Sequence, residues 1–194
     1  MAGIALTDAV AAIRSGTMAI IPTDTVYGIA ALPEAAVAIF DVKRRPRDKA
    51  LPVLGSDAAQ LGGIAELDDR ARALADEHWP GPLTIVVRRK QSFAPDLGGD
   101  DPTTVAVRVP AHPVAQELLR ATGPLAVTSA NVSGEPPATT YEEACALAGG
   151  PGVVCLDGGT CDGVPSTVLS LVGEPRVLRR GALDLSAWLS RRAR

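Results

Sequence analysis

The stretch 103-TTVAVRVPAHPVAQELLRATGPLAVTSAN-131 sets the fold class, because it joins three structural patterns without an intervening linker. Residues 103–110 alternate in part between apolar and polar side chains, which predicts a strand. Residues 113–122 have the spacing of a helix, and the apolar run at 125–130 predicts a second strand. A strand, a helix and another strand in succession indicate an α/β domain.

Strand and helix patterns continue to alternate on both sides of this stretch. Short apolar runs bounded by Gly and Pro predict strands, and longer periodic segments predict helices. Thr7 or Asp8 is expected to cap the first helix, Pro46 to end the second, and Thr140 with Glu143 to form a capping box. The further strands are expected at 17–21, 51–55, 83–89, 153–157, 166–172 and 175–181, and the further helices at 8–15, 34–45, 66–79, 141–148 and 183–194.

The connections between these elements range from hairpin-short to helical. Such variety favours a mixed parallel and antiparallel open sheet with flanking helices. The chain has 194 residues with no internal repeat and no linker, so one domain over residues 1–194 is expected. Hydrophobic residues make up 46% of the chain but aromatic residues only 3%, so the core must consist of Ala, Val, Leu and Ile.

The composition disfavours membrane, secreted and metal-binding proteins. The chain begins without the pattern of a signal peptide, and no apolar run approaches the roughly 20 residues of a membrane helix, so a cytoplasmic protein without membrane contact is expected. Cys145, Cys155 and Cys161 form no C-x-x-C and are expected to be free thiols. The two histidines lie far apart, so no metal site on the protein is expected.

Polar side chains follow the strand at 17–21 in the segment 22-PTDTVYG-28. The hydroxyls of Thr23, Thr25 and Tyr27 alternate along this segment, and side chains two residues apart on an extended backbone point the same way. We therefore expect the three hydroxyls to line one wall of a site. The alternative is a strand edge that carries solvated threonines.

The segment 43-KRRPRDK-49 concentrates positive charge in a chain of net charge −3. Five of its seven residues are cationic, and two of the three lysines in the chain, Lys43 and Lys49, lie here. A solvated charge run at a helix end is the ordinary interpretation. However, Pro46 restricts the backbone and an apolar strand follows, which holds the lysines and Arg45 near the start of that strand. Lysine and arginine together suit phosphate oxygens.

A third polar segment, 127-VTSANVSGEPPATT-140, begins as a strand and runs into small hydroxyl and amide side chains. Such groups, together with exposed backbone N–H groups, can surround an anion or a nucleotide. The candidate residues are Thr128, Ser129, Asn131 and Ser133. The alternative is an ordinary turn.

The last candidates are Ser166 and Thr167 at the start of a late strand and Arg179 at the end of the next one. Arg108 lies within the strand at 103–110, where a buried charge would need a partner and an outward-facing arginine would not. No G-x-x-x-x-G-K-[ST], G-x-G-x-x-G or G-x-S-x-G occurs, so any nucleotide would be bound by another device. Nothing in the sequence places Ser129, a histidine and an aspartate together as a catalytic triad.

Seven short motifs occur in one order: PTDTVYG, K-x-R-P with a second Lys four residues after the Arg, WPGPLT, VAVRVP-x-HP, SAN-x-SG, STV and R-x-G. Each motif alone is weak, but the ordered set is specific. From about Gly16 to Gly181 the chain resembles the YrdC/Sua5 family of threonylcarbamoyl-AMP synthases, in the short form without the extra C-terminal domain. The resemblance implies a YrdC-like fold, a twisted mixed sheet with a concave basic cavity.

The resemblance also implies an enzyme, a nucleotidyltransferase. It would convert L-threonine, bicarbonate or CO2, and ATP into L-threonylcarbamoyl-AMP and pyrophosphate. Mg²⁺ is expected as cofactor, carried mainly by the ATP phosphates, because Mg²⁺ usually keeps several waters and takes few protein ligands. In the family a separate tRNA threonylcarbamoyl transferase then uses the product to form t6A at adenosine 37 of tRNA. Weak direct binding of tRNA is left open.

Residues that match the motifs inherit expected roles. Lys43 and Arg45 are expected to be catalytic, and with Ser129 and Asn131 they match the signature tetrad of the family. Arg108 is similar to a strand arginine that lies near the amino-acid carboxylate. The remaining residues expected to bind substrate or nucleotide are Thr23, Thr25, Tyr27, Lys49, Thr128, Ser133, Ser166 and Arg179.

The cationic segment has a place in this reaction. N-carboxythreonine, a dianion, would attack the α-phosphorus of ATP, and Lys43, Arg45 and Lys49 would neutralise the combined charge. No nucleophile or general base on the protein is assigned. Arg44 and Arg180 depart from the usual family pattern, and their roles are left open.

Two alternatives are kept. A protein that binds double-stranded RNA or tRNA would use the basic cavity as a groove for the phosphate backbone, although the negative net charge and the few aromatic residues disfavour it. A carbamoyltransfer relative, as in hydrogenase-maturation proteins that contain this domain, would come as a much longer chain.

Overall fold

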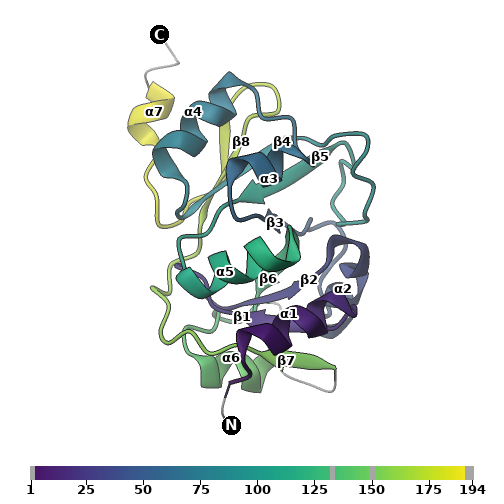
Figure 1. The fold of residues 1–194 in the computed structure, drawn as a ribbon. Coiled ribbons are helices and arrows are strands. Elements are labelled where there is room, and N and C mark those ends of the chain that lie inside the picture. The colour runs from purple at the N-terminus through teal and green to yellow at the C-terminus, as the bar shows by residue number, and fades with distance from the viewer. Residues whose placement is uncertain (1–2, 132–133, 149–151, 191–194) are drawn as a thin grey trace.

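The computed structural model of the chain describes residues 3–131, 134–148 and 152–190. The strands in these ranges form one mixed sheet in the order β7-β1-β2-β6-β3-β5-β4-β8-β9, with helices packed against it (Figure 1). This confirms the predicted mixed open sheet with flanking helices. The strands are β1 (Met18–Ile21), β2 (Gly28–Ala31), β3 (Val53–Leu54), β4 (Leu83–Arg88), β5 (Thr104–Arg108), β6 (Leu125–Ser129), β7 (Val153–Cys155), β8 (Thr167–Ser170) and β9 (Arg176–Arg179). The helices are α1 (Leu6–Arg14), the short 3-10 helix η1 (Pro33–Ala35), α2 (Val37–Lys43), α3 (Ala58–Gly62), α4 (Asp69–His78), α5 (Pro113–Thr122), α6 (Tyr141–Ala148) and α7 (Ser186–Ser190).

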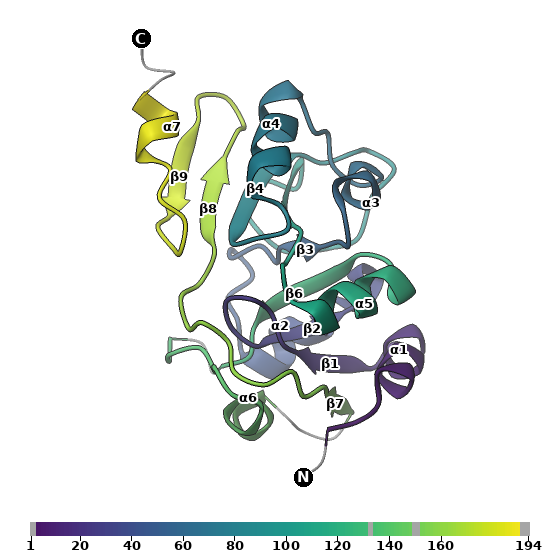
Figure 2. The ribbon, with the colours of Figure 1, turned by 60° about the vertical axis from the view of Figure 1, so that its left-hand side comes forward.

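The sheet combines parallel and antiparallel pairs. β1 with β7, β3 with β5 and β4 with β8 are parallel, whereas the pairs β1–β2, β2–β6, β6–β3, β5–β4 and β8–β9 are antiparallel. The middle strand, β3, has only two residues, Val53 and Leu54. On one side of it lie β6, β2, β1 and β7, and on the other β5, β4, β8 and β9. These two sets form the lower and upper parts of the molecule in Figure 2.

Most elements lie where the sequence patterns predicted them. The helix α5 spans Pro113–Thr122, the predicted range. The predicted capping box at α6 is present: Glu143 N donates to Thr140 Oγ1 at 3.3 Å, and Thr140 N donates to Glu143 Oε2 at 3.2 Å. These two bonds satisfy backbone and side-chain groups at the start of the helix reciprocally.

Several helix boundaries differ from the prediction, and the ends of α1 and α2 show why. The helix α1 has Ala5 at its N-cap and no side-chain cap, so neither Thr7 nor Asp8 caps it. The helix α2 ends at Lys43 rather than at Pro46, since Arg44 takes a left-handed conformation with φ 49° and turns the chain.

Two elements were not predicted. The strand β2 reads GIAA, and all four of its residues are buried, so it lacks the alternation that identifies a half-exposed strand. The helix α3 has five residues, too few to show a helical period, and is started by Asp57, whose carboxylate accepts a bond from Gln60 N at 2.7 Å.

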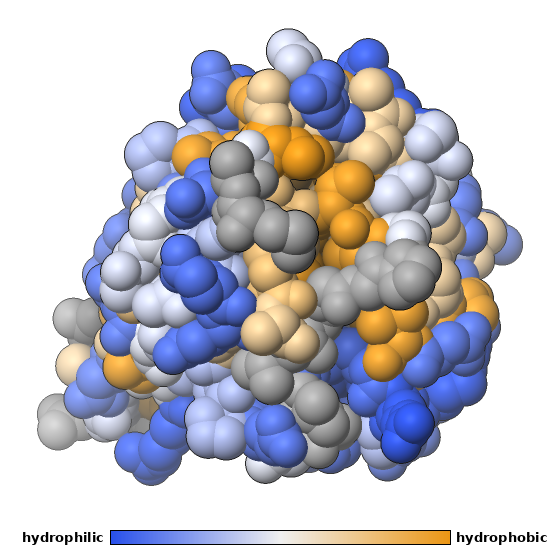
Figure 3. Space-filling model, turned by 90° about the horizontal axis from the view of Figure 1, so that it is seen from below, coloured by the Kyte–Doolittle hydropathy of each residue, from blue (hydrophilic) through white to orange (hydrophobic). Residues whose placement is uncertain are grey.

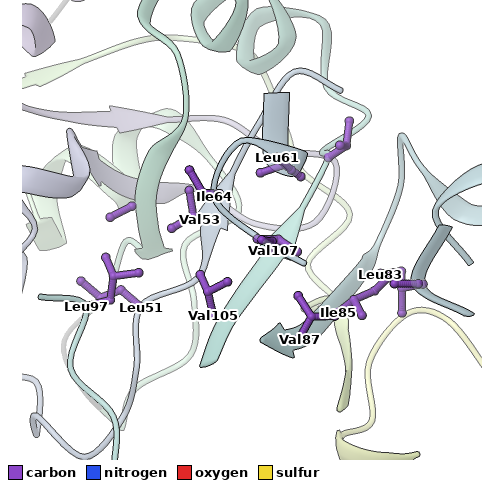
Figure 4. Close-up of a cluster of buried hydrophobic side chains, with 14 of the residues drawn as sticks. Leu51, Val53, Leu61, Ile64, Leu83, Ile85, Val87, Leu97, Val105 and Val107 are labelled. Atoms are coloured by element: carbon purple, nitrogen blue, oxygen red, sulfur yellow. The ribbon is translucent and has the colours of Figure 1, made fainter. Parts of the chain in front are cut away.

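The largest group of buried apolar side chains spans both parts: it includes Ile29 of β2 and Phe40 of α2, and it continues across β3 to β4, β5, α3 and α4. Figure 4 shows several of its side chains. Side chains alternate across a strand, so Thr84 and Arg108 point to the face of the sheet opposite this core. That opposite face holds the candidate site. The core side chains that β4 and β5 contribute are Leu83, Ile85, Val87, Val105 and Val107.

Two smaller groups of buried side chains complete the interior. One lies beneath α1 and α5, which run side by side in the lower part (Figure 1), and includes Ile13 and Leu118. The other packs Tyr27 and Cys161 against α6, which contributes Tyr141. The three cysteines are free thiols, as predicted.

The surface offers two further observations. No helix within the described ranges is long and apolar enough to cross a membrane. Seen from below, hydrophobic residues gather near the middle of the face, with hydrophilic residues around them (Figure 3).

Candidate functional site

A cavity of about 710 Å³ lies on the face of β4 and β5 that is opposite the core, and segments from both parts of the sheet enclose it. Four cationic residues line it, Arg45, Lys49, Arg108 and Arg179, together with Glu135. The other lining residues that matter below are Thr23, Thr25, Tyr27, Thr84, Thr128, Ser129, Asn131 and Ser166. Nearly all of the predicted site residues therefore converge on one cavity.

A second groove of similar size, about 720 Å³, lies beside α3 and α4 and is lined by residues such as Arg70 and Lys90. None of the predicted site residues that the structure describes lines it.

Lys43, Ser129 and Asn131 meet in one hydrogen-bonded cluster. Lys43 Nζ donates to the carbonyl oxygen of Ser129, to its hydroxyl at 3.4 Å and to Asn131 Oδ1 at 3.1 Å. The Ser129 hydroxyl also donates to Asn131 Oδ1, at 2.5 Å. Lys43 ends α2, and the other two residues lie at the end of β6, so the fold joins these distant segments at one edge of the cavity.

A glycine permits this close packing at the end of β6. Gly28 pairs with Ser129 in the β2–β6 ladder. A Cβ atom on Gly28 would lie 2.6 Å from Val127 Cγ1 and 3.2 Å from the Thr128 carbonyl oxygen. Only glycine therefore lets β2 approach β6 this closely.

The Lys43 cluster is largely shielded from water, and Lys43 itself is 5% exposed. Burial, together with the neighbouring Arg45 cation, lowers the pKa of the Lys43 ammonium from 10.5 to about 8. An anion bound in the cavity would favour the charged form. Lys43 is thus a cation whose charge is sensitive to what occupies the site.

Arg45 and Lys49 belong to the turn that connects α2 with β3. Arg45 Nε donates to the Lys49 carbonyl oxygen at 2.9 Å, and Nη2 donates to that of Ala50 at 3.1 Å. The turn therefore folds around the Arg45 guanidinium. Both cationic side chains line the cavity. Arg45 is half-buried and so is not part of a solvated charge run, whereas Lys49 is exposed.

The segment 22-PTDTVYG-28 is not the extended wall that the sequence suggested, because its middle forms a bend between β1 and β2. The Thr23 hydroxyl donates to the Val26 carbonyl oxygen at 2.6 Å and accepts bonds from the backbone N–H groups of Thr25 and Val26 at 3.2 Å each. Thr25 Oγ1 lies 3.0 Å from Thr23 Oγ1. Thr23 and Thr25 are 3% and 2% exposed, so they are not solvated either.

Tyr27 lines the cavity, but its hydroxyl does not share the direction of the two threonines. The hydroxyl donates to the Gly159 carbonyl oxygen at 2.8 Å and accepts a bond from Gly158 N at 3.1 Å, on the loop after β7. Burial raises the pKa of Tyr27 to about 12. The prediction that all three hydroxyls face one way is wrong, because the bend removes the strand period.

Arg108 is buried and has three kinds of partner. Its Nη2 donates to Asp24 Oδ1 at 2.7 Å, its Nη1 to Thr25 Oγ1 at 3.0 Å and its Nε to the Gly81 carbonyl oxygen at 2.9 Å. Asp24 Oδ1 also accepts a bond from Ala111 N at 3.0 Å. The outward-facing alternative for Arg108 is therefore wrong, and its charge is paired inside the protein. Burial nevertheless lowers the pKa of Arg108, against the effect of Asp24.

Ser166 and Arg179 meet across the β8–β9 pair. Arg179 donates from Nη2 to the Ser166 hydroxyl at 3.0 Å, and from Nε and Nη2 to the Ser166 carbonyl oxygen at 3.1 and 2.9 Å. Burial lowers the pKa of Arg179, and so do the neighbouring cations of Arg108 and Arg45. Three guanidinium groups therefore repel one another around this cavity, which makes it receptive to an anion.

Gly181 supports this corner of the cavity, and we expect Gly181→Ala to disrupt it. An added Cβ would meet the carbonyl oxygen of Pro165 and would lie 2.6 Å from that of Ser166, both backbone atoms. The loop must shift, so the variant should lose about 1–3 kcal/mol of stability. Urea unfolding would measure the loss. Gly62→Ala is the matched control because nothing lies within 4 Å of its Cβ position, and equal stabilities of the two variants would contradict the expectation.

The remaining predicted residues have varied surroundings. Thr128 lines the cavity and is 8% exposed. Ser133 lies outside the described residues. Arg44 is exposed at the end of α2, outside the cavity lining. His112 Nε2 lies 3.2 Å from the Gly158 carbonyl oxygen, and the Ser129 hydroxyl is bonded to an amide, so these two residues do not form a triad.

Sequence reasoning missed two residues of the site, Asp24 and Thr84. Asp24 pairs with Arg108, and Thr84 Oγ1 lies 2.8 Å from Ser166 Oγ. Each occurs inside a quoted motif, PTDTVYG and WPGPLT. The signal for Asp24 was the need of a strand arginine for a counter-charge. Nothing in the sequence indicated Thr84, because threonine is common in strands.

Comparisons with known proteins match this chain to one family. The Sua5_yciO_yrdC family model, described as "Telomere recombination", matches residues 11–181. A putative threonylcarbamoyl-AMP synthase of Mycobacterium tuberculosis is 44% identical over 185 residues, which cover 92% of this chain and 85% of the relative.

Two solved structures share the fold. The crystal structure of P. abyssi Sua5 complexed with L-threonine matches with a TM-score of 0.89 and 36% identity, over 95% of this chain and 56% of that chain. The crystal structure of E. coli YciO matches with a TM-score of 0.86 and 26% identity, over 93% of this chain and 91% of that chain. The present chain thus spans little more than half of the P. abyssi protein.

Proposed function

This chain belongs to the Sua5/YciO/YrdC family, and we propose that it is a threonylcarbamoyl-AMP synthase. It would be a nucleotidyltransferase that forms threonylcarbamoyl-AMP and pyrophosphate from L-threonine, bicarbonate or CO2, and ATP. One observation carries the proposal: the Lys43–Ser129–Asn131 cluster stands at the edge of a cavity that four further cationic residues line. Relatives with this name and a relative bound to L-threonine support it.

The cationic residues of the site would reduce the repulsion between the two anionic reactants. N-carboxythreonine and ATP are both anions, and the carboxylate must approach the α-phosphorus. Lys43 and Arg45 would stabilise the charge that develops there, and Lys49, exposed at the rim, would hold the outer phosphates. The Arg45 guanidinium is held in place before substrate arrives, because it bonds to its own turn.

The two ends of the cavity suit the two substrates. Ser129 and Asn131, which are bonded to Lys43, would hold the nucleotide. Thr25, Arg108, Ser166 and Arg179 would surround the amino acid. Because Asp24 already balances the charge of Arg108, the carboxylate of threonine would be attracted mainly by Arg179 and oriented by Arg108.

Mg²⁺ would enter as a complex with ATP. Within the described residues no group of three or more His, Cys, Asp or Glu side chains is placed to bind a metal. The cavity lining carries the carboxylate of Glu135 among cationic neighbours. Such a lining fits an ion held by phosphate oxygens and water better than one held by the protein. The product would pass to a tRNA threonylcarbamoyl transferase for t6A formation in the cytoplasm.

Release of pyrophosphate from ATP tests the proposal directly. We expect the purified chain to release pyrophosphate only when L-threonine and bicarbonate are both present, and less with L-serine than with L-threonine. Mass spectrometry should detect threonylcarbamoyl-AMP in the same mixture. If ATP stays intact under every combination, the synthase proposal is wrong, and salt-dependent binding of tRNA is the next measurement.

The affinity for ATP should fall as the pH rises through about 8. The free protein has a Lys43 pKa of about 8, lowered by burial and by Arg45, so this lysine loses its charge above that pH. Polyanionic ATP binds the charged form better and is itself fully ionised there. Calorimetric titration between pH 7 and 10 at fixed ionic strength measures the change, and Lys43→Met should bind weakly with little pH dependence. A wild-type affinity that stays constant up to pH 9.5 would contradict this role of Lys43.

A further inference from the structure

Thr84 is a buried hydroxyl in the cavity that the proposed mechanism does not use. It lies on the face of β4 that points away from the core, is 3% exposed and lines the cavity. Its Oγ1 is 2.8 Å from Ser166 Oγ. The backbone fixes this approach, because β4 and β8 are paired with Thr84 opposite Val168, and Thr167 N donates to the Pro82 carbonyl oxygen at 2.9 Å.

Thr84 and Ser166 each have one hydroxyl hydrogen, and the hydrogen bonds of the two side chains limit where these hydrogens can point. A guanidinium group only donates, so Ser166 Oγ accepts from Arg179 and keeps its own proton to give. Thr84 also has one hydroxyl proton. The bond between the two hydroxyls uses one of these two protons. Among the described residues neither hydroxyl has another hydrogen-bond partner, so the second proton has no acceptor within that part of the chain.

A buried hydroxyl proton without an acceptor is uncommon in proteins. Both hydroxyls line the cavity, so water or a bound molecule in the cavity can supply the acceptor for the second proton. The three surrounding guanidinium groups attract an anionic oxygen to this place. When substrate displaces water from the cavity, an oxygen of its carboxylate or phosphate can take the place of this acceptor.

We propose that Thr84 is a positioning residue that directs the hydroxyl proton of Ser166 to an anionic oxygen of the substrate. Without ligand, Ser166 gives its proton to Thr84. When an anionic oxygen binds, the Thr84 hydroxyl rotates and donates a hydrogen bond to Ser166 Oγ. The Ser166 hydroxyl then donates its hydrogen bond to the ligand. Only a hydroxyl at position 84 can accept in one state and donate in the other. The bond from Arg179 polarises Ser166 and makes it a stronger donor in both. This inference rests on the proposed function.

Paired variants at position 84 test the role. Thr84→Val keeps the shape of the side chain but can neither accept nor donate, whereas Thr84→Ser keeps the hydroxyl. Calorimetry with L-threonine alone and with ATP alone should show about 3- to 10-fold weaker binding of one ligand for Thr84→Val, the effect of one hydrogen bond. Thr84→Ser should restore the affinity. Weaker binding of L-threonine identifies a carboxylate acceptor, and weaker binding of ATP identifies a phosphate.

A double-mutant cycle separates positioning from a general structural effect. In a Ser166→Ala background, Thr84→Val should cause no additional loss of affinity, because the proton that it directs is absent. Thr104→Val is the matched control, since Thr104 on β5 bonds to the Asp101 carbonyl oxygen and not to Ser166. It should leave both affinities unchanged.

Two results would overturn the inference: wild-type affinities for both ligands in Thr84→Val, or the same loss in the presence and absence of the Ser166 hydroxyl. The outcome is independent of turnover. If the wild-type chain forms no threonylcarbamoyl-AMP but the two hydroxyls are still coupled in binding, the proposed function fails and the role of Thr84 stands.

Discussion

Lys43→Met should lower the rate of threonylcarbamoyl-AMP formation by about 10²–10³-fold, the usual effect of removing one group that stabilises developing negative charge. Methionine has a similar length but no charge and no hydrogen-bond donor. The substitution would therefore remove the cation and also release Ser129 and Asn131, which Lys43 holds at the end of β6. Pyrophosphate release under saturating L-threonine, bicarbonate and ATP measures this effect.

The chain supplies its own control for Lys43. Lys90 is the lysine outside the cationic segment, and it lines the groove beside α3 and α4 instead. Lys90→Met changes the net charge equally but should leave the rate unchanged. Removing the buried charge removes its desolvation cost, but Ser129 and Asn131 lose a hydrogen-bond donor, so urea unfolding of Lys43→Met accompanies the rate measurement. A rate within about twofold of the wild type would exclude Lys43 from the chemistry.

Arg108→Met should destabilise the protein by about 3–5 kcal/mol, the range found when one partner of a buried ion pair is removed. The Asp24 carboxylate would remain, 16% exposed, without its cation. Thr25 Oγ1 and the Gly81 carbonyl oxygen would also lose a donor. Urea unfolding at pH 7, compared with the wild type, gives the change in free energy.

A second substitution distinguishes loss of the ion pair from loss of packing. In Arg108→Met combined with Asp24→Asn no unpaired charge remains, so part of the lost stability should return. The double variant should stay inactive if Arg108 orients the amino acid. Equal stabilities of the single variant and the wild type would show that the pair contributes little, as is common for exposed pairs.

The sequence predicted which residues form the site better than it predicted how their side chains are oriented. Ordered motifs brought Lys43, Ser129 and Asn131 to one place, because motif residues converge wherever the fold is the same. The predicted direction of the Tyr27 hydroxyl was wrong, because a bend at residues 24–26 replaces the extended backbone on which side chains two residues apart point the same way. Local turns depend on partners far along the chain, and one such partner is Gly159, which accepts the Tyr27 hydroxyl bond.

The fold was predictable where periodicity was strong and not where it was weak. The helix α5 was placed to the residue, whereas the four buried residues of β2 gave no alternation. The sequence did not identify Asp24 as the partner of Arg108, because the two residues are 84 positions apart in the chain. Thr84 was overlooked because its importance comes from Ser166, which is 82 residues away in sequence.

The shortness of β3 has a consequence for how substrate affinity and rigidity are related. The sheet is joined at its middle by the backbone pairs of two residues, Val53 and Leu54. Lys43 and Ser129 belong to the part below this joint, and Ser166 and Arg179 to the part above it. A substrate that contacts both parts would add a second connection between them beside β3. Because coupling is reciprocal, amide hydrogen exchange at β3 should slow when substrate binds, and a substitution that loosens β3 should weaken binding without touching the ligand.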